Sequence, residues 1–182
     1  MKSKAVFLDR DGVINHDHAY VHAIEEFEFI DGVFDACKYF SDNGFKIVVV
    51  TNQSGIGRGY YDEMQFQKLS DWMCQQFSSH DINISGVYFC PHHPKKALSQ
   101  YLLDCDCRKP KPGMILQAIE EHNIDPKQSI MVGDKVSDMQ AAEAAGVTTK
   151  ILVCSGQTLS DEDKSHADLV CGSLAEVPEK LV

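Results

Sequence analysis

Short apolar runs that each end in polar residues constrain the fold of this chain more than any other feature. Helix-like segments separate the runs, because their apolar residues recur at helical spacing. Strands that alternate with helices form parallel β-α-β units. The sequence therefore predicts an α/β fold, with a Rossmann-like open, mostly parallel sheet and helices on both faces. The predicted strands are 5–8, 46–50, 87–89, 129–132 and 149–153, and the predicted helices are 32–43, 62–79, 112–122 and 137–145.

The domain organisation predicted from the sequence is a single domain over 1–182. The chain has 182 residues, 43% of them hydrophobic, which is enough for one buried core. Gly44 is placed to end the first helix and Pro112 to be the first residue of the third. The segments 15–30, 53–61 and 90–111 are too short for a separate cap domain. The last 25 residues carry no clear pattern, apart from a short helix near Leu174.

Charge and hydropathy exclude several classes of function. Lys and Arg number 17 against 27 Asp and Glu, a net charge of −10 that disfavours binding to nucleic acid or to an anionic membrane. The first apolar run stops at Asp9, so no secretory signal is predicted, and no apolar stretch is long enough to span a bilayer. We therefore expect a cytoplasmic protein, monomeric by default, that binds anions only where a pocket concentrates positive charge or holds a metal.

The polar residues after the strands are candidates for chemistry, because the carboxyl ends of parallel strands meet at one edge of a sheet. Asp9 and Asp11 follow the first strand, and Asp134 follows the fourth. In this position one carboxylate can attack a substrate while its neighbour transfers a proton. Carboxylate oxygens at three strand-end positions also suit Mg²⁺. The alternatives are a solvated turn for Asp9 and Asp11, and a simple helix cap for Asp134.

An anion could bind at the end of the second strand. Thr51 offers a hydroxyl, and the backbone amides of 52–55 lie in a glycine-containing turn of the kind that binds anions. Lys109 is the best candidate for the cation that neutralises a bound phosphate. The basic stretch 108–112 could instead be an ordinary solvated loop.

A cysteine and histidine cluster has the spacing of a metal site. Cys90 and His92 form one close pair, and Cys105 and Cys107 follow as a second. Three thiolates and one imidazole make a closed tetrahedral Zn²⁺ site, which we interpret as structural because it leaves no open position. Such a site would order the loop and direct Arg108 and Lys109 to the pocket. His93 is the alternative ligand, and a redox pair or buried thiols is the alternative role.

The ordered motifs of this chain resemble those of the haloacid dehalogenase (HAD) superfamily of phosphatases. The motifs are 9–13, 51–53, Lys109 and 133–138. The cysteine loop and the compact length without a cap resemble the group that contains heptose-bisphosphate phosphatases and histidinol-phosphatases. The stretches 17–22, 52–59, 90–94 and 105–110 are more similar to the heptose enzymes. Val13 stands where Thr is common in the family.

The resemblance implies a role for each matching residue. Asp9 would be the nucleophile that forms an aspartyl-phosphate, and Asp11 the acid and base. Mg²⁺ would bind the Asp9 carboxylate, the Asp11 carbonyl and Asp134, with Lys135 and Asp138 ordering the groups around it. Thr51 and Lys109 would hold the phosphoryl oxygens. The residues expected to contact substrate are Asp17, His18, Ala19, Tyr20, Asn52, Gln53, Ser54, Arg108 and Lys135.

The function implied is a Mg²⁺-dependent phosphatase acting on a small sugar bisphosphate. Histidinol phosphate is the alternative substrate, because that group shares every catalytic motif. A non-catalytic zinc-binding scaffold is a further alternative, which the intact set of catalytic residues disfavours. A phosphatase acting on nucleic-acid ends is disfavoured by the net charge of −10.

Overall fold

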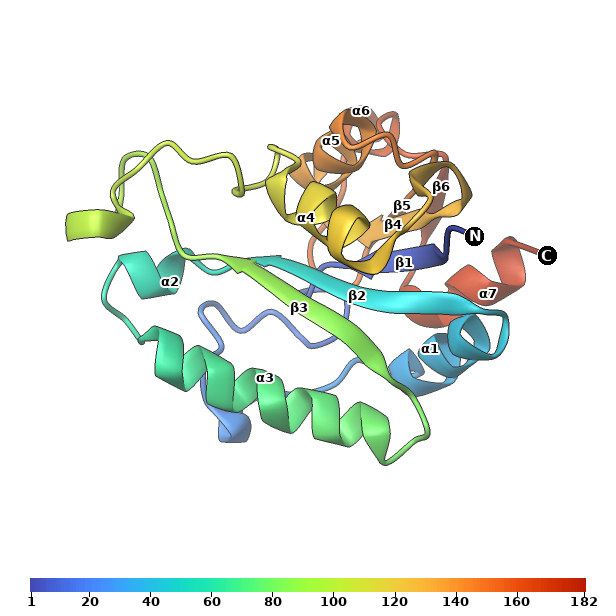
Figure 1. Cartoon of the computed structure of the whole chain (residues 1–182), viewed down its shortest axis with the longest axis horizontal. Coiled ribbons are helices and arrows are strands. Elements are labelled where there is room, and N and C mark those ends of the chain that lie inside the picture. Colours follow the sequence, from blue (N-terminus) through green and yellow to red (C-terminus); the bar gives the residue numbers. More distant parts are fainter.

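A six-stranded parallel sheet forms the centre of the molecule. The computed structural model describes residues 1–182. The strand order is β3-β2-β1-β4-β5-β6, and every neighbouring pair is parallel. Figure 1 shows the sheet between two layers of helices. The strands are β1 (Lys4–Leu8), β2 (Phe45–Asn52), β3 (Ile84–Cys90), β4 (Ile130–Gly133), β5 (Thr149–Val153) and β6 (Leu169–Cys171).

Helices cover both faces of the sheet. In Figure 1, α1 and α3 lie on one side of it and α4 and α5 on the other. The helices are α1 (Val33–Asp42), α2 (Ser54–Gly57), α3 (Glu63–Ser78), α4 (Gly113–His122), α5 (Val136–Ala144), α6 (Asp161–Lys164) and α7 (Val177–Lys180). Single turns of 3-10 helix lie at η1 (Ile24–Glu26), η2 (Ser99–Tyr101), η3 (Pro126–Gln128) and η4 (Leu174–Glu176). None of these helices is long and apolar enough to cross a membrane.

The apolar core is divided by the sheet into two parts. On β1, Val6 and Leu8 belong to the part that packs against α1 and α3, while Ala5 and Phe7 belong to the part under α4 and α5. Successive side chains of a strand point to opposite faces, so a strand buried on both faces is a continuous apolar run. The runs at 5–8 and 46–50 have this form for this reason.

The α/β fold with an open parallel sheet is confirmed, and the five predicted strands are all present. The short strand β6 was not predicted from the sequence. Pro112 lies at the N-cap of α4 rather than inside it, so that helix begins one residue later than predicted. Gly44 has φ +80° directly after the C-cap Asn43, as expected of a glycine that ends a helix. Near Leu174, a 3-10 turn is followed by the one-turn helix α7.

The order of the strands brings the predicted polar groups together. Strand β1 lies between β2 and β4, with Leu8 paired to Val49 on one side and to Val132 on the other. The residues after Leu8, Val50 and Val132 therefore emerge side by side at the carboxyl edge of the sheet. This is the crevice in which open α/β sheets bind ligands.

Candidate active site

Three buried carboxylates meet at the carboxyl edge of the sheet. Asp9 follows β1, Asp134 follows β4, and Asp138 lies in the first turn of α5; their oxygens lie within 4.8 Å of one another. Asp138 is fixed by the backbone, because its Oδ2 accepts hydrogen bonds from the amides of Asp134 and Lys135, both 3.1 Å long. The loop between β4 and α5 thus presents Asp134 toward Asp9 in a defined position.

Lys109 supplies the positive charge that this cluster needs. Its Nζ lies 3.0 Å from Asp9 Oδ1 and 2.7 Å from Asp138 Oδ1, and it donates to the carbonyl oxygen of Val50 at 2.8 Å. Burial opposes the charge of Lys109, but Asp138 and Asp9 outweigh it and raise the pKa of Lys109 above its ordinary value. Burial likewise raises the pKa of Asp9, yet Lys109 and Lys135 reverse this and hold that pKa below its ordinary value. Asp9 is therefore an ionised carboxylate at neutral pH, as a nucleophile must be.

Asp134 is the carboxylate without a partner. Both of its oxygens are buried and accept no hydrogen bond, and Lys135 Nζ approaches only to 3.8 Å. Burial, followed by the nearby Asp9, raises the pKa of Asp134 to about 8. A Cβ at Gly12 or at Gly156 would collide with this carboxylate, so two glycines leave room around it. Unpartnered carboxylate oxygens beside the ionised Asp9 are a donor set that fits Mg²⁺.

Asp11 is held by three side-chain donors. Its oxygens accept from Arg10 Nη2 at 3.0 Å, from Asn15 Nδ2 at 3.0 Å and from Gln53 Nε2 at 3.1 Å. The same Gln53 amide donates to Thr51 Oγ1 at 2.9 Å, and the Thr51 hydroxyl itself donates to the carbonyl oxygen of Asn52 over a long 3.5 Å. A single amide group thereby links Asp11 to Thr51.

A cleft of about 540 Å³ opens beside these groups. Of the residues expected to contact substrate, eight line it: Asp17, Ala19, Tyr20, Asn52, Gln53, Ser54, Arg108 and Lys135. Asp11 and Lys109 line it as well. The structure does not bring His18 to the cleft, because its exposed Nε2 lies 3.1 Å from Glu28 Oε2. Tyr61 and Ser137 also line the cleft, and the sequence reasoning missed both.

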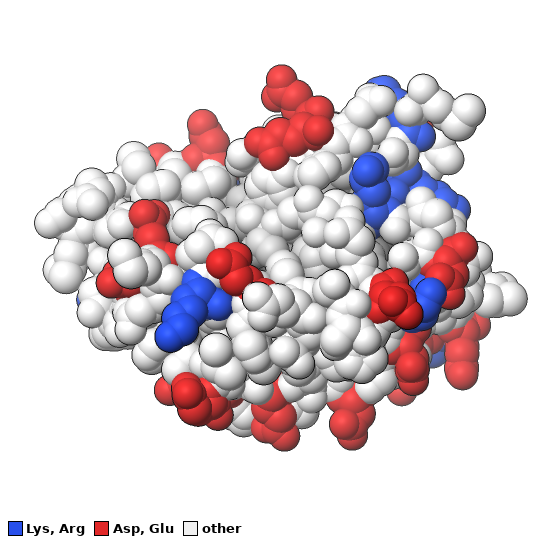
Figure 2. Space-filling model, turned by 60° about the horizontal axis from the view of Figure 1, so that its bottom comes forward, with Lys and Arg blue, Asp and Glu red and all other residues white.

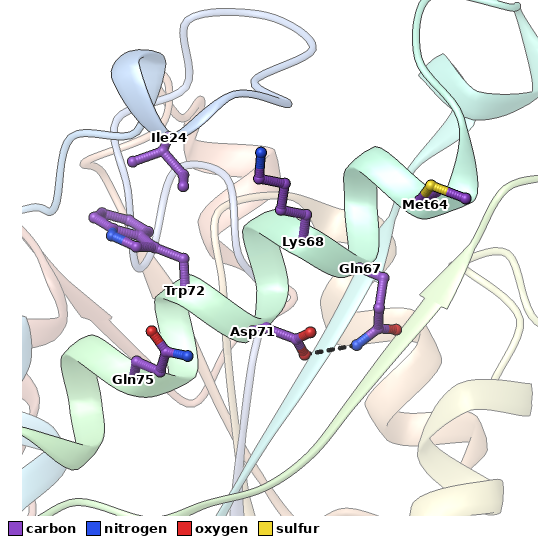
Figure 3. Close-up of a pocket in the computed structure, with 7 residues that line it drawn as sticks. All are labelled: Ile24, Met64, Gln67, Lys68, Asp71, Trp72 and Gln75. Atoms are coloured by element: carbon purple, nitrogen blue, oxygen red, sulfur yellow. Dashed lines mark hydrogen bonds between the residues drawn. The ribbon is translucent and has the colours of Figure 1, made fainter.

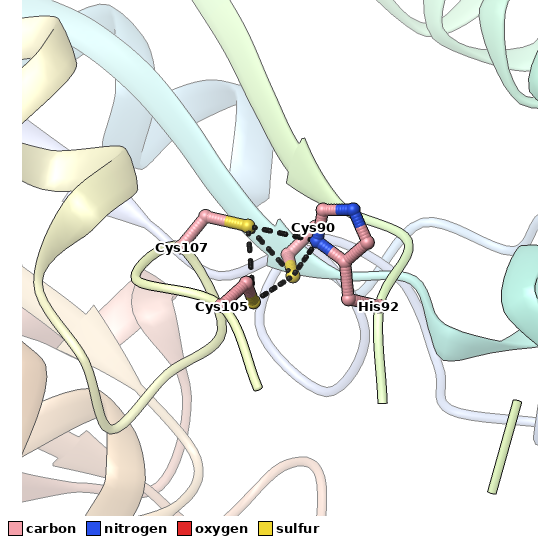
Figure 4. A group of neighbouring side chains, drawn as sticks. All are labelled: Cys90, His92, Cys105 and Cys107. Carbon is pink, nitrogen blue, oxygen red and sulfur yellow. Dashed lines mark hydrogen bonds between the residues drawn. The ribbon is translucent and has the colours of Figure 1, made fainter. Parts of the chain in front are cut away.

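Cys90, His92, Cys105 and Cys107 converge as the spacing predicts (Figure 4). Cys107 Sγ lies 2.9 Å from Cys90 Sγ, 3.4 Å from Cys105 Sγ and 3.4 Å from His92 Nδ1. Contact with the Cys90 thiol lowers the pKa of Cys107 to about 5, which favours the thiolate form that binds metals. The cluster could hold a metal ion through four protein ligands.

His93, the alternative ligand, has a different role. Its Nδ1 accepts from the backbone amides of Lys95 and Lys96, at 3.1 and 3.0 Å, and so shapes the loop. Burial lowers the pKa of His93, and the charges of Arg108 and Arg58 lower it further.

A second hollow, of about 440 Å³, lies on the outer side of α3 (Figure 3). Ile24, Met64 and Trp72 provide its apolar surface, and Gln67 donates to Asp71 Oδ1 at 2.8 Å along its edge. It holds none of the predicted site residues. The space-filling view of Figure 2, in which the bottom of Figure 1 is turned forward, shows acidic side chains scattered over this face with no broad basic surface.

Comparisons with known proteins agree with the motifs. The profile of a family described as HAD-hydrolase-like matches residues 106–177. The D-glycero-beta-D-manno-heptose-1,7-bisphosphate 7-phosphatase of Yersinia pestis is 51% identical over 97% of this chain and 94% of its own length. The enzyme of the same name from Haemophilus ducreyi is 52% identical, over 97% of each chain.

A solved crystal structure is also similar to this chain in fold. The crystal structure of D,D-heptose 1.7-bisphosphate phosphatase from B. bronchiseptica, complexed with magnesium and phosphate, matches with a TM-score of 0.83 and 31% identity. The match covers 98% of this chain and 97% of that one. Together with the carboxylate and lysine cluster, these similarities show that the chain is a phosphoric monoester hydrolase of the HAD family, and that it belongs to the family of the heptose-bisphosphate phosphatases.

Proposed function

We propose that this protein removes the C7 phosphate of D-glycero-D-manno-heptose 1,7-bisphosphate. The observation that carries the proposal is the position of Asp9, 3.0 Å from Lys109 Nζ and beside the unpartnered Asp134, at a cleft lined by Arg108. The names of the relatives and of the matching crystal structure support the choice of substrate.

Mg²⁺ would be held by the carboxylates of Asp9 and Asp134 and by the backbone carbonyl of Asp11. The ion would neutralise charge on the phosphoryl oxygens and so reduce their repulsion from the nucleophile. The crystal structure of the B. bronchiseptica relative contains magnesium and phosphate, which supports this assignment. Asp138 serves by holding the Asp134 loop and by pairing with Lys109.

In the first chemical step, an Asp9 oxygen attacks the phosphorus atom and forms an aspartyl-phosphate. The bond from phosphorus to the sugar oxygen breaks, and Asp11 gives its proton to that oxygen as it leaves. Lys109 and the hydroxyl group of Thr51 stabilise the charge on the transferring phosphoryl group. Lys109 is suited to this because its burial and its two carboxylate partners fix the ammonium group in one position.

In the second step, Asp11 takes a proton from water, and the resulting nucleophile attacks the phosphorus of the aspartyl-phosphate. Inorganic phosphate leaves and the carboxylate of Asp9 is regenerated. Asp11 can serve as acid and then as base because its side chain lines the cleft, where the leaving oxygen and the water would lie. Two displacements with a covalent intermediate replace one more difficult displacement.

We further propose that the cysteine and histidine cluster binds Zn²⁺ in a structural role. Four ligands close the coordination sphere, so the ion takes no part in the reaction. Cys105 and Cys107 directly precede Arg108 and Lys109, and the site therefore fixes the segment that carries both cations.

The proposed substrate indicates the pathway in which the protein would act. The product, a heptose 1-phosphate, would be used in the formation of ADP-heptose for the core of lipopolysaccharide. Thiolate ligands remain reduced in the cytoplasm, where we place the protein. We expect it to act as a monomer, because the cleft is complete within one chain.

A comparison of substrates tests the proposal. Phosphate release from heptose 1,7-bisphosphate and from histidinol phosphate is measured side by side, with Mg²⁺ and after Mg²⁺ has been removed. Fast, Mg²⁺-dependent release from the heptose substrate alone is expected. A preference for histidinol phosphate would overturn the substrate, and no release from either would overturn the proposed function.

A further inference from the structure

Two arginines at or beside the cleft wall have no acidic partner. Arg58 and Arg108 form none of the ion pairs in the structure, although the chain carries ten more negative than positive charges. In an acidic protein, unpaired arginines beside a substrate cleft indicate an anionic ligand. Arg108 lines the cleft directly.

Arg58 has an unsatisfied donor that is already buried. Its Nε carries no hydrogen bond and is shielded from solvent, and the same holds for Nη1 of Arg108. A buried N–H group without an acceptor is costly, and most such groups in proteins find a partner. Both guanidinium groups have unused donors and would gain from an anionic acceptor.

The backbone of Arg58 is held firmly beside the cleft. Arg58 is the C-cap of α2, and the preceding residue, Gly57, accepts a 2.7 Å hydrogen bond from the amide of Leu98 in the cysteine loop. A Cβ at Gly57 would collide with the carbonyl oxygen of Pro91, so the contact between α2 and this loop is close. The loop that positions Arg108 therefore also positions Arg58.

The side chain of Arg58 lies against an aromatic residue of the cleft wall. Its guanidinium carbon lies 5.6 Å from the centre of the Tyr20 ring, and Tyr20 lines the cleft. Tyr20 has φ +56°, a left-handed conformation that a residue with a Cβ rarely adopts. Strain of this kind persists where the surrounding structure imposes it, and it is concentrated at binding sites. Here it places the ring against the Arg58 guanidinium and at the wall of the cleft.

We propose that Arg58 is a specificity-determining residue, which acts with Arg108 to bind the distal phosphate of a sugar bisphosphate. This rests on the proposed function, since a substrate with one phosphate offers nothing for Arg58 to bind. Because the distal phosphate does not react, its binding strengthens the complexes of substrate and of transition state equally. The contribution of Arg58 therefore appears in KM and not in kcat.

The test compares two substrates that differ only in the distal phosphate, heptose 1,7-bisphosphate and heptose 7-phosphate. Arg58→Gln should raise KM for the bisphosphate about tenfold, the loss expected for one charge-assisted hydrogen bond, with kcat changed less than about twofold. Both constants for the monophosphate should stay unchanged. Arg58→Lys, which keeps the charge but not the planar fork, should give an intermediate KM for the bisphosphate. Lys68→Gln on α3, outside the cleft, is the matched control for loss of a surface charge.

Two results would overturn the role of Arg58. One is an unchanged KM for the bisphosphate in Arg58→Gln. The other is an equal rise for both substrates, which would indicate a general disturbance of the cleft.

A binding measurement separates this inference from the proposed function. Calorimetric titration with mannose 1,6-bisphosphate and with mannose 6-phosphate, without added Mg²⁺, needs no turnover. If the wild-type protein fails to hydrolyse the heptose substrate but Arg58→Gln weakens binding of the bisphosphate alone, the anion site stands and the proposed function fails. If Arg58→Gln binds both ligands as the wild type does, the anion site fails whatever the activity.

Discussion

Asn52 holds the backbone of Lys109 from both sides. Its Oδ1 accepts from the amide of Lys109 at 3.1 Å, and its Nδ2 donates to the Lys109 carbonyl oxygen at 3.2 Å. The two residues lie 57 positions apart in sequence, one at the end of β2 and the other after the cysteine loop. The Asn52 side chain therefore fixes the position of the Lys109 backbone, from which the ammonium group reaches the carboxylate cluster.

Asn52→Ala should therefore lower kcat about 10- to 100-fold, because a small displacement of Lys109 weakens charge stabilisation in the transition state. The cost in stability should be modest, about 1–2 kcal/mol, for two partly buried hydrogen bonds. Steady-state kinetics and urea unfolding measure both. Asn43→Ala, which removes an exposed amide at the end of α1, is the control. A kcat within twofold of the wild-type value would show that Lys109 does not depend on Asn52.

Lys109→Met should unfold far more easily than the wild type and should lose turnover. The ammonium group is buried and pairs with Asp9 and Asp138, so its removal leaves two buried carboxylates without a counter-ion. Breaking a buried pair in this way costs about 3–5 kcal/mol. Urea unfolding at pH 7 provides the measurement, with the exposed Lys127→Met as control. A loss below about 1 kcal/mol would contradict the role given to this cation.

Asp134→Asn should stabilise the protein when Mg²⁺ is absent. The pKa of Asp134 is about 8 in the folded chain, against an ordinary value of 3.8. Between these values the folded chain holds a proton that the unfolded chain releases, so the free energy of unfolding falls as pH rises from about 4 to 8. The variant has no such carboxylate and should be more stable than the wild type by about 1–3 kcal/mol at pH 8, with the difference vanishing toward pH 4.

Mg²⁺ should reverse that order. A cation that binds the ionised carboxylate stabilises only the wild type, so Mg²⁺ should raise the Tm of the wild type at pH 8 and leave that of Asp134→Asn nearly unchanged. Thermal unfolding of both proteins at pH 5 and pH 8, with and without Mg²⁺, makes the comparison. An equal rise in Tm for the two proteins would place the metal elsewhere.

Cys107→Ala should lose bound zinc and disorder the loop 90–108. Three remaining ligands bind Zn²⁺ much more weakly than four, and a metal that orders a loop contributes its binding energy to folding. KM should rise, because Arg108 follows the loop directly. Metal analysis of the purified proteins should give about one zinc per wild-type chain and far less in the variant. Cys154→Ala, which removes an exposed thiol outside the cluster, is the control. Unchanged zinc in Cys107→Ala would refute the four-ligand site.

The sequence predicted the elements whose burial leaves a pattern in the chain. Strands β1, β2 and β4 are buried on both faces and therefore appear as continuous apolar runs. Strand β6 was missed, because it has three residues at the edge of the sheet and only Cys171 in it is buried. The four-residue helix α2 was missed too, since one turn is too short to show a period.

The residues of the site also fall into those that a sequence pattern reveals and those that it does not. The residues at strand ends, such as Asp9 and Asp134, could be found because topology alone brings strand ends together. The position of Tyr61 in the cleft depends on how 53–61 folds back toward Gln53, and no local pattern encodes that. His18 has neighbours in the cleft, yet its ring lies beside Glu28, which belongs to a segment ten residues away. Sequence spacing alone could not show that Tyr61 lines the cleft and that His18 does not.

The proposed reaction takes place at one of two phosphates, the C7 phosphate of the heptose. Phosphorus NMR of heptose 1,7-bisphosphate incubated with the wild-type protein and Mg²⁺ follows both groups in one sample. We predict that the signal of the C7 phosphate disappears, inorganic phosphate appears in equal amount, and the signal of the C1 phosphate persists. Loss of the C1 phosphate, or survival of both signals, would contradict the account.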